Sequence, residues 1–277
     1  MIINYAEKIG LDKSLINHLK VIVQNYEERI KKLSKNLLNG IDCLAKENDL
    51  MRLAVVLNCL NSTNEIYKAH GISDDIFWNT ASDIKIWCES NQNKGLRNYH
   101  WITNHLKGEL FRLGRLQFQI YTCCNNAIDY SKLPFDCGEK VIYIHIPQGE
   151  KLIYDDCVKS INDAKTFFKT YFPDYKFKYF FCESWLLYEG NANFMKQDSN
   201  ILKFASLFNI AYSVKEQSQA IKRIFGEKRE NADDYPEKTS LQKAAKKYIQ
   251  NNNTLGLGIG TIKAVTYTHL TLPTIRL

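Results

Sequence analysis

The sequence predicts an α+β protein in which a helical N-terminal part is followed by a mixed α/β sheet domain. Three observations predict this class: apolar residues recur at helical spacing from about residue 12 to residue 110, the period becomes strand-like at Gly114, and a strand–helix–strand unit spans residues 140–187. The chain has 277 residues, of which 45% are hydrophobic and 24% charged, a composition typical of globular proteins. We therefore expect a helical domain over residues 1–111 and a sheet domain over residues 112–265.

Four helices are predicted in the N-terminal part. The first begins after Asp12, and the second covers about residues 45–70. Ser73 begins the third, because its side-chain oxygen and the acidic residues after it satisfy the free amides of a helix N-terminus. This third helix carries apolar residues as far as Trp87, and the fourth covers residues 101–110.

The sheet domain begins with a strand that alternates strictly between polar and apolar residues over 114–120, which predicts a half-buried strand. Its polar face carries Arg115, Gln117 and Gln119, and its apolar face carries Leu116, Phe118 and Ile120. With Arg112, the first two of these polar residues offer hydrogen-bond donors for an anionic or carbonyl-bearing ligand. A solvated sheet face explains them equally well.

The strand–helix–strand unit is the centre of the predicted sheet. A strand over 141–146 leads through a Pro-Gln-Gly turn into a helix over about 155–171, and a second strand covers 179–187. Both strands are apolar at adjacent positions, which indicates burial on both faces. The connection predicts a parallel pair with a right-handed crossover.

The carboxyl ends of these two strands are expected to lie side by side, at the rim where open α/β sheets bind ligands. His145, Glu183 and Trp185 are placed at this rim. Apolar neighbours deprive Glu183 of hydration, which raises its pKa towards the range useful for a general base; a glutamate paired with Lys or Arg is an equally good interpretation. His145 is a candidate base as well, although holding the turn by a backbone hydrogen bond is the favoured role.

The last third of the chain predicts shorter elements. They are a helix capped by Ser199 or Asn200, strands over 210–214 and 220–225, and a final helix over 241–249. The glycines at 256, 258 and 260 are interpreted as a helix terminator, because no helix follows them as a phosphate-binding loop requires. Residues 266–277 resemble translated sequencing-adapter sequence and are expected to be a non-native tail, with a Thr-rich edge strand as the alternative.

Composition and charge argue against several partners. The net charge of +7 is modest, so a lysine-rich solvated surface is favoured over a nucleic-acid interface. No basic region precedes an apolar stretch at the start, and no apolar run reaches the ~20 residues of a membrane span. The eight cysteines contain no C-x-x-C pair, which favours reduced thiols in a cytoplasm. No metal site is predicted, because His100 and His105 do not share a helix face.

Several stretches together carry a resemblance. They are Trp101 with residues 104–118; His145-Ile146-Pro147 with Gly149 and Ser160; Phe167-Phe168 with Tyr171-Phe172-Pro173 and residues 182–187; and finally Ser199-Asn200-Ile201 with residues 239–242. Together they resemble the two-domain bacterial acyltransferase family that has a helical N-terminal domain and a GNAT-like C-terminal domain. The resemblance covers the chain up to the predicted tail, so residues 112–265 are expected to form the GNAT-like acyltransferase domain.

The resemblance implies transfer of an acyl group from acyl-CoA (acetyl-CoA or longer) to the amine of a small molecule, without a metal. The backbone of Ile144 and Ile146 would bind the pantetheine arm. Gln148 and Gly149 would face the pyrophosphate at a helix N-terminus, with Asn200 as a further contact. The usual Q/R-x-x-G-x-G/A loop is replaced here by Pro-Gln-Gly-Glu.

The resemblance also implies the catalytic roles. Glu183 is the first choice of base and His145 the second. Tyr212 is a possible acid for the leaving thiolate, with core packing as its favoured role. The residues expected to contact the substrate are Arg112, Arg115, Gln117 and Trp185. The alternative from another functional class is a catalytically inert GNAT-like module that binds a small molecule or a partner protein.

Overall fold

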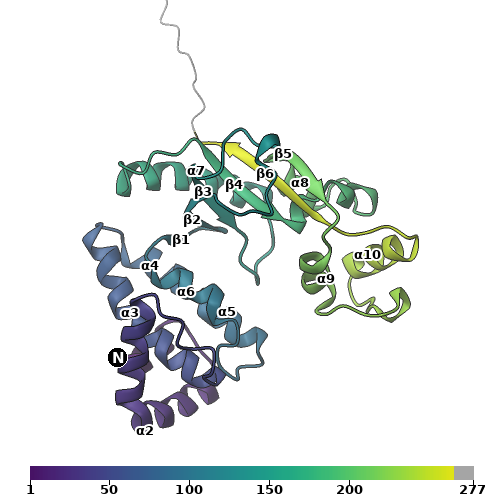
Figure 1. Cartoon of the computed structure of the whole chain (residues 1–277). Coiled ribbons are helices and arrows are strands. Elements are labelled where there is room, and N and C mark those ends of the chain that lie inside the picture. Colours follow the sequence, from purple (N-terminus) through teal and green to yellow (C-terminus); the bar gives the residue numbers. More distant parts are fainter. Residues whose placement is uncertain (265–277) are drawn as a thin grey trace, which may run out of the picture. The chain divides into compact units, whose positions relative to one another are not determined.

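The computed structural model describes residues 1–264 and contains two compact units (Figure 1). The first unit consists of Met1–Ile120 and Ile144–Pro173, and the second begins with Tyr121–Tyr143 and resumes at Asp174. The boundaries therefore fall inside strand β2 (Leu116–Thr122) and inside strand β3 (Lys140–His145). The predicted tail at 266–277 lies outside the described residues.

The first unit is mainly helical. Its helices are α1 (Ile2–Lys8), α2 (Lys13–Leu38), α3 (Asp49–Ala69), α4 (Asp74–Ala81), α5 (Asp83–Ser90), α6 (Tyr99–Leu106) and α7 (Tyr154–Tyr171). Helix α3 contacts α1, α2, α4 and α6, and five consecutive residues at 53–57 are buried. A helix that is buried on all sides in this way needs no polar face, so α3 is the centre around which the other helices of this unit pack.

Local signals fixed most helix starts but not every helix end. Asp12 caps α2, as expected, by accepting hydrogen bonds from the backbone of Ser14 and Leu15. The third predicted helix is wrong in extent, because the chain divides it at Ser82 into α4 and α5. The fourth stops at Leu106, before Gly108 with its positive φ of 68°, so residues 107–110 are not helical.

Residues 110–113 instead form a strand that the sequence did not predict. This strand, β1 (Leu110–Leu113), pairs antiparallel with β2, with Leu113 opposite Leu116. Gly114 occupies the first position of the two-residue turn with a φ of 68°, and a Cβ there would lie 2.9 Å from Ser160 Oγ. Gly114 therefore begins a hairpin turn and does not begin the strand as predicted.

The second unit contains a mixed sheet. Its strands after β3 are β4 (Tyr179–Ser184), β5 (Asn209–Val214) and β6 (Leu257–Lys263). Strands β3 and β4 are parallel, with Ile142 opposite Phe180, whereas β6 runs antiparallel to β4 on one side and to β5 on the other (Figure 1). The predicted parallel pair and the predicted class, helices followed by a mixed sheet, are confirmed.

Strand β4 is shorter than predicted. The Ser184 hydroxyl accepts a hydrogen bond from the backbone of Leu186 (3.2 Å), and residues Trp185–Leu187 form a 3₁₀ turn. A side chain that binds the backbone two residues ahead competes with the strand ladder. Trp185 therefore follows the strand instead of belonging to it.

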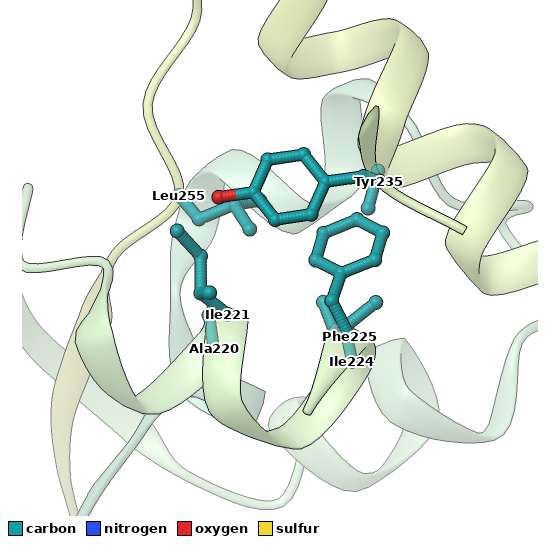
Figure 2. Close-up of a cluster of buried hydrophobic side chains, with 7 residues drawn as sticks. Ala220, Ile221, Ile224, Phe225, Tyr235 and Leu255 are labelled. Atoms are coloured by element: carbon teal, nitrogen blue, oxygen red, sulfur yellow. The ribbon is translucent and has the colours of Figure 1, made fainter. Parts of the chain in front are cut away.

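The predicted strand at 220–225 is wrong, because these residues belong to helix α9 (Ser218–Phe225). Its buried side chains have helical spacing and pack with α10 (Ser240–Gln250) and the segments around it. Figure 2 shows this cluster, in which the ring of Tyr235 stacks on Phe225 at 4.3 Å; its labelled members are Ala220, Ile221, Ile224, Phe225, Tyr235 and Leu255. A short apolar run fits a strand or a helix, and tertiary packing decided for the helix.

The glycines at 256–260 do not terminate a helix as interpreted. Gly258 and Gly260 lie in the central strand β6, where a Cβ on Gly258 would collide with the Leu187 carbonyl. They permit close backbone approach inside the sheet. Helix α8 (Asn200–Ala205), capped by Ser199, strand β5 and helix α10, capped by Thr239, are formed as predicted.

Candidate active site

A buried polar cluster lies in the first unit around the end of β3. Helix α5 supplies Asp83, α6 supplies Trp101 and His105, β2 supplies Gln119, and His145 is the last residue of β3. The indole Nε1 of Trp101 donates to Asp83 Oδ2 (2.8 Å), and His105 Nε2 lies 3.1 Å from the same oxygen. The ring of Trp101 also meets His145 edge-on, with the ring centroids 4.8 Å apart. One tryptophan thus links the buried carboxylate to the predicted catalytic histidine.

Asp83 remains ionised although it is only 2% exposed. Burial would raise its pKa, but His105 and the indole donors of Trp101 and Trp87 lower the pKa below its usual value. His105 is 1% exposed, and its Nδ1 has no hydrogen-bond partner within residues 1–264. The Asp83 carboxylate is therefore a buried charge that accepts hydrogen bonds from the indoles of Trp87 on α5 and Trp101 on α6, with the His105 ring beside it.

His145 is held in its neutral form, whereas Asp83 is held in its charged form. Burial, and after it repulsion from His105, lowers the pKa of His145 to about 3, although Asp83 partly offsets the shift. Its Nε2 lies 2.9 Å from Gln119 Oε1, a carbonyl oxygen that only accepts hydrogen bonds, so Nε2 carries the proton and Nδ1 the lone pair. At neutral pH His145 is therefore a neutral ring.

The arginines proposed as ligand donors already hold a loop. The guanidinium of Arg115 donates to three backbone carbonyls, those of Pro147 (3.0 Å), Glu150 (2.9 Å) and Lys151 (3.0 Å), and burial lowers its pKa. Arg112 Nη2 lies 2.7 Å from Glu150 Oε1. Together they define the shape of the turn that contains the exposed Gln148 and Gly149 and neutralise its glutamate. The predicted contacts of these residues with substrate stay predictions.

A hollow of about 290 Å³ adjoins this loop at the start of α7. Three positive and three negative side chains line it: Arg115, Lys151, Lys159, Glu150, Asp156 and Asp163. Because the charges balance, the hollow offers no excess positive charge to a pyrophosphate. Any recognition of phosphate by the turn would rest on its backbone amides.

Gln117 is the most informative residue on β2. Its side chain is 1% exposed, and within residues 1–264 neither Nε2 nor Oε1 has a hydrogen-bond partner. Gln119 on the same strand and Arg115 in the turn before it are buried too, so the solvated sheet face is wrong: both faces of this strand are covered. A buried carboxamide without partners costs about 1–3 kcal/mol.

The predicted backbone sites flanking His145 are the buried Ile144 and the half-buried Ile146.

The second unit carries the other predicted catalytic residues. Burial, and after it Glu216, raises the pKa of Glu183, as expected from its apolar neighbours. Glu183 and Tyr212 both lie opposite Ile259, one on each side of β6, so they share a face at about 10 Å, two strand spacings apart. The Tyr212 hydroxyl accepts a hydrogen bond from the Asp129 amide (2.8 Å). Their catalytic roles stay predictions.

Trp185 and Asn200 lie elsewhere in this unit. The backbone N–H of Trp185 donates to Gln219 Oε1 (2.7 Å), and its ring packs against the α9–α10 cluster shown in Figure 2. Asn200 is exposed at the start of the six-residue helix α8. Within residues 1–264, neither the Trp185 side chain nor the Asn200 side chain forms a hydrogen bond with Glu183.

Two family models cover nearly the whole described chain. Residues 2–108 match a model described as an N-acyltransferase N-terminal domain, and residues 110–262 match one described as a GNAT-like C-terminal domain. The chain belongs to this family of two-domain N-acyltransferases. The family expected from the sequence motifs is thereby confirmed, and a comparison with curated proteins found no match.

Solved structures of acyltransferases share the fold. One, in complex with decanoyl-CoA and teicoplanin, has a TM-score of 0.77 at 20% identity over 95% of this chain and 87% of its own. Another, in complex with CoA and 10C-teicoplanin, has a TM-score of 0.78 at 18% identity over the same shares. A mutant in complex with octanoyl-CoA has a TM-score of 0.77 at 18% identity, covering 94% of this chain and 86% of its own.

Sequence reasoning missed Asp83, His105 and Gln119 as members of this N-acyltransferase's buried cluster. One signal was present: Trp101 and His105 are four apart on a helix and so share a face. Asp83 gave no comparable signal, because its partners come from another helix. Among residues 1–264, no group of three or more His, Cys, Asp or Glu side chains is arranged to hold a metal ion, and no helix is long and apolar enough to cross a membrane.

Proposed function

We propose that this protein transfers an acyl group from acyl-CoA to the amine of a small molecule. The observation that carries the proposal is the match of residues 110–262 to the GNAT-like domain, on a chain that folds into the expected mixed sheet. Acyltransferases of the same fold bind CoA, octanoyl-CoA and decanoyl-CoA, which supports a medium or long acyl chain as well as acetyl. Teicoplanin beside one of them supports a small-molecule acceptor.

The unpartnered side chain of Gln117 supports an amide-bearing ligand. A carboxamide both donates and accepts hydrogen bonds, and each amide of a pantetheine arm offers one donor and one acceptor in return. Binding would remove the cost of the unpaired groups in Gln117. The backbone of Ile144 and Ile146 and the turn at Gln148 and Gly149 would bind the rest of the CoA. Asn200, in the second unit, stays a predicted contact.

The reaction is direct attack of the amine on the thioester carbonyl. In our proposal Glu183 takes the amine proton, because its raised pKa makes it a better base than a solvated glutamate. The tetrahedral intermediate then collapses, the C–S bond breaks, and Tyr212 gives a proton to the leaving thiolate. His145 is the second candidate base, since its lone pair on Nδ1 needs no prior loss of a proton.

Arg112 and Arg115 act on substrate through the loop whose carbonyls and glutamate they hold. Trp185, packed at the end of β4, is retained as a contact for the acceptor.

We also propose a cytoplasmic, bacterial location, where the eight free thiols of the chain would persist.

Calorimetry and turnover together test this function. Acetyl-, octanoyl- and decanoyl-CoA are titrated into the full chain, and the acylated amine is then measured by mass spectrometry over a panel of acceptors. We expect binding below millimolar concentration, and a 10²–10⁴-fold loss of turnover in Glu183→Gln with CoA binding retained. The exposed Glu189→Gln serves as the matched control and should keep full activity.

Other outcomes would show which part of the proposed function is wrong. Absence of CoA binding would overturn the function. Binding without turnover for any acyl chain or acceptor would favour the inert binding module over the enzyme. Full activity in Glu183→Gln, combined with loss in His145→Gln, would move the role of base to His145.

A further inference from the structure

Two exposed cysteines of the second unit lie in contact. The Sγ atoms of Cys124 and Cys137 are 3.2 Å apart, and both residues are exposed. The other six cysteines of the chain are buried or, in the case of Cys43, partly buried. The hydrogen bond to Cys124 is the main cause that raises the pKa of the Cys137 thiol, which reflects how closely the two sulfurs interact.

The backbone holds the two cysteines opposite each other. The amide of Cys123 donates to the Glu139 carbonyl (3.0 Å), and the amide of Gly138 donates to the Cys123 carbonyl (2.7 Å). These two hydrogen bonds close the base of the loop formed by residues 124–137, as the last hydrogen-bonded pair of an antiparallel ladder does. Side chains opposite each other in such a pair have Cβ atoms about 4.5–5.5 Å apart, so a small local adjustment reaches the separation of a disulfide.

The loop closed by this pair covers the face of the sheet that carries Tyr212. Its residues Ile128 and Phe135 are buried against Phe181 and Ile259 of the central strands. Between them, the amide of Asp129 donates to the Tyr212 hydroxyl (2.8 Å). A cross-link at the base of the loop would therefore restrain the loop residues that cover Tyr212.

We propose that Cys124 and Cys137 form a reversible disulfide that fastens this loop over the face of the sheet carrying Tyr212. The oxidant is a peroxide. The thiolate of one cysteine attacks the peroxide oxygen and becomes a sulfenic acid with loss of water or alcohol. The second thiol then attacks that sulfur, the S–S bond forms, and a second water leaves. A dithiol reductant returns both thiols. The site does not depend on the proposed acyl transfer.

Peptide mapping tests the linkage directly. The full chain is treated with hydrogen peroxide at low molar excess, free thiols are alkylated under denaturing conditions, and the protein is digested with trypsin without reduction. Cleavage after Arg115, Lys132 and Lys140 places Cys124 on one peptide and Cys137 on the next. We expect these two peptides to be linked within one chain, with the mass of two hydrogen atoms lost and restored by dithiothreitol.

Variants identify the sulfurs, because the first peptide also contains Cys123. Cys124→Ser and Cys137→Ser should each abolish the link, whereas Cys123→Ser and the distant control Cys43→Ser should retain it. Separately alkylated peptides after peroxide treatment would overturn the proposal. So would a link through Cys123, or one that joins two chains on a non-reducing gel.

Hydrogen exchange tests the consequence for the loop. In the oxidised wild-type chain, exchange of the Asp129 amide should slow about tenfold relative to the reduced chain, because opening of the loop is restrained. In Cys137→Ser the same treatment should leave exchange unchanged. Equal exchange in the oxidised and reduced wild type would refute the fastening of the loop even if the disulfide forms.

Discussion

Replacing His145 by glutamine is expected to remove much of the protein's sensitivity to mild acid. Burial and His105 lower the pKa of His145 to about 3, whereas the ring of the unfolded chain titrates near its usual value of 6.5. Below that pH the unfolded state binds a proton that the folded state does not bind. The free energy of unfolding therefore falls as the pH falls from 6.5 towards 3, and this contribution is fully present only above that range.

The magnitude follows from the two pKa values. Each pH unit inside this range is worth about 1.4 kcal/mol, so His145 alone should cost the wild-type protein about 2 kcal/mol between pH 7.5 and pH 5. Glutamine binds no proton in this range. Its side-chain N–H replaces the Nε2–H that donates to Gln119 Oε1, so the hydrogen bond of 2.9 Å is kept while the titration is removed.

Urea unfolding at pH 7.5 and pH 5 measures the effect. The matched control is His18→Gln, which removes a solvent-exposed histidine of the same unit. Between the two pH values, wild type and His18→Gln should each lose about 2 kcal/mol more stability than His145→Gln. Equal losses in all three proteins, within about 0.5 kcal/mol, would refute the assignment of a depressed pKa to His145.

Three further experiments, with four substitutions, test single sites. Asp83→Asn removes the buried carboxylate that accepts hydrogen bonds from the indoles of Trp101 and Trp87, so urea unfolding should show a loss of about 3 kcal/mol or more, and an unchanged stability would contradict a structural role of this carboxylate. Gln117→Leu should leave stability unchanged or raise it by about 1 kcal/mol, because neither polar atom has a partner, while the KM for acyl-CoA rises about tenfold; a large loss of stability would show that the carboxamide has a structural partner. Gly258→Ala should cost about 3 kcal/mol in thermal unfolding and Gly260→Ala much less, since a Cβ on Gly258 would overlap the Leu187 carbonyl, whereas a Cβ on Gly260 would lie 3.3 Å from the Asn209 carbonyl oxygen; equal costs would contradict this.

The sequence predicted elements whose signals are local. Asp12, Ser199 and Thr239 each begin a helix by accepting a backbone hydrogen bond, as their side chains predict. The parallel pairing of β3 with β4 followed from two apolar strands joined by a helical connection. These inferences needed only neighbouring residues and one connection rule.

The failures have a common physical origin. Residues 220–225 are apolar at positions that fit either period, and the choice of a helix depends on Tyr235 and Leu255, which come later in the chain. Residues 256–260 are glycine-rich because other residues approach their backbone, Val214 and Tyr188 at Gly256 and Leu187 at Gly258, not because a helix ends there. In both cases the deciding contact lies far away in sequence, where periodicity carries no information.

The buried polar face of β2 shows the same limit for the candidate site. Strict alternation predicted the strand correctly, but it does not tell whether water or protein covers the polar face. The structure covers it, so Gln117 and Gln119 lie in the interior. Gln119 has His145 as its partner across 26 residues, and Gln117 has none among the described residues. A buried glutamine without a partner needs an explanation, and the one we propose for Gln117 is an amide-bearing ligand.

The pKa values of the two candidate bases are shifted in opposite directions by the same cause, which is burial. Burial raises the pKa of Glu183 and lowers that of His145, so each environment favours the neutral form of its group. For a glutamate this strengthens the base, since the carboxylate binds a proton more readily. For a histidine it weakens the base, since the imidazolium it would form is disfavoured. The physical chemistry of burial therefore supports our proposal that Glu183, ahead of His145, removes the proton, the same order that the sequence predicted.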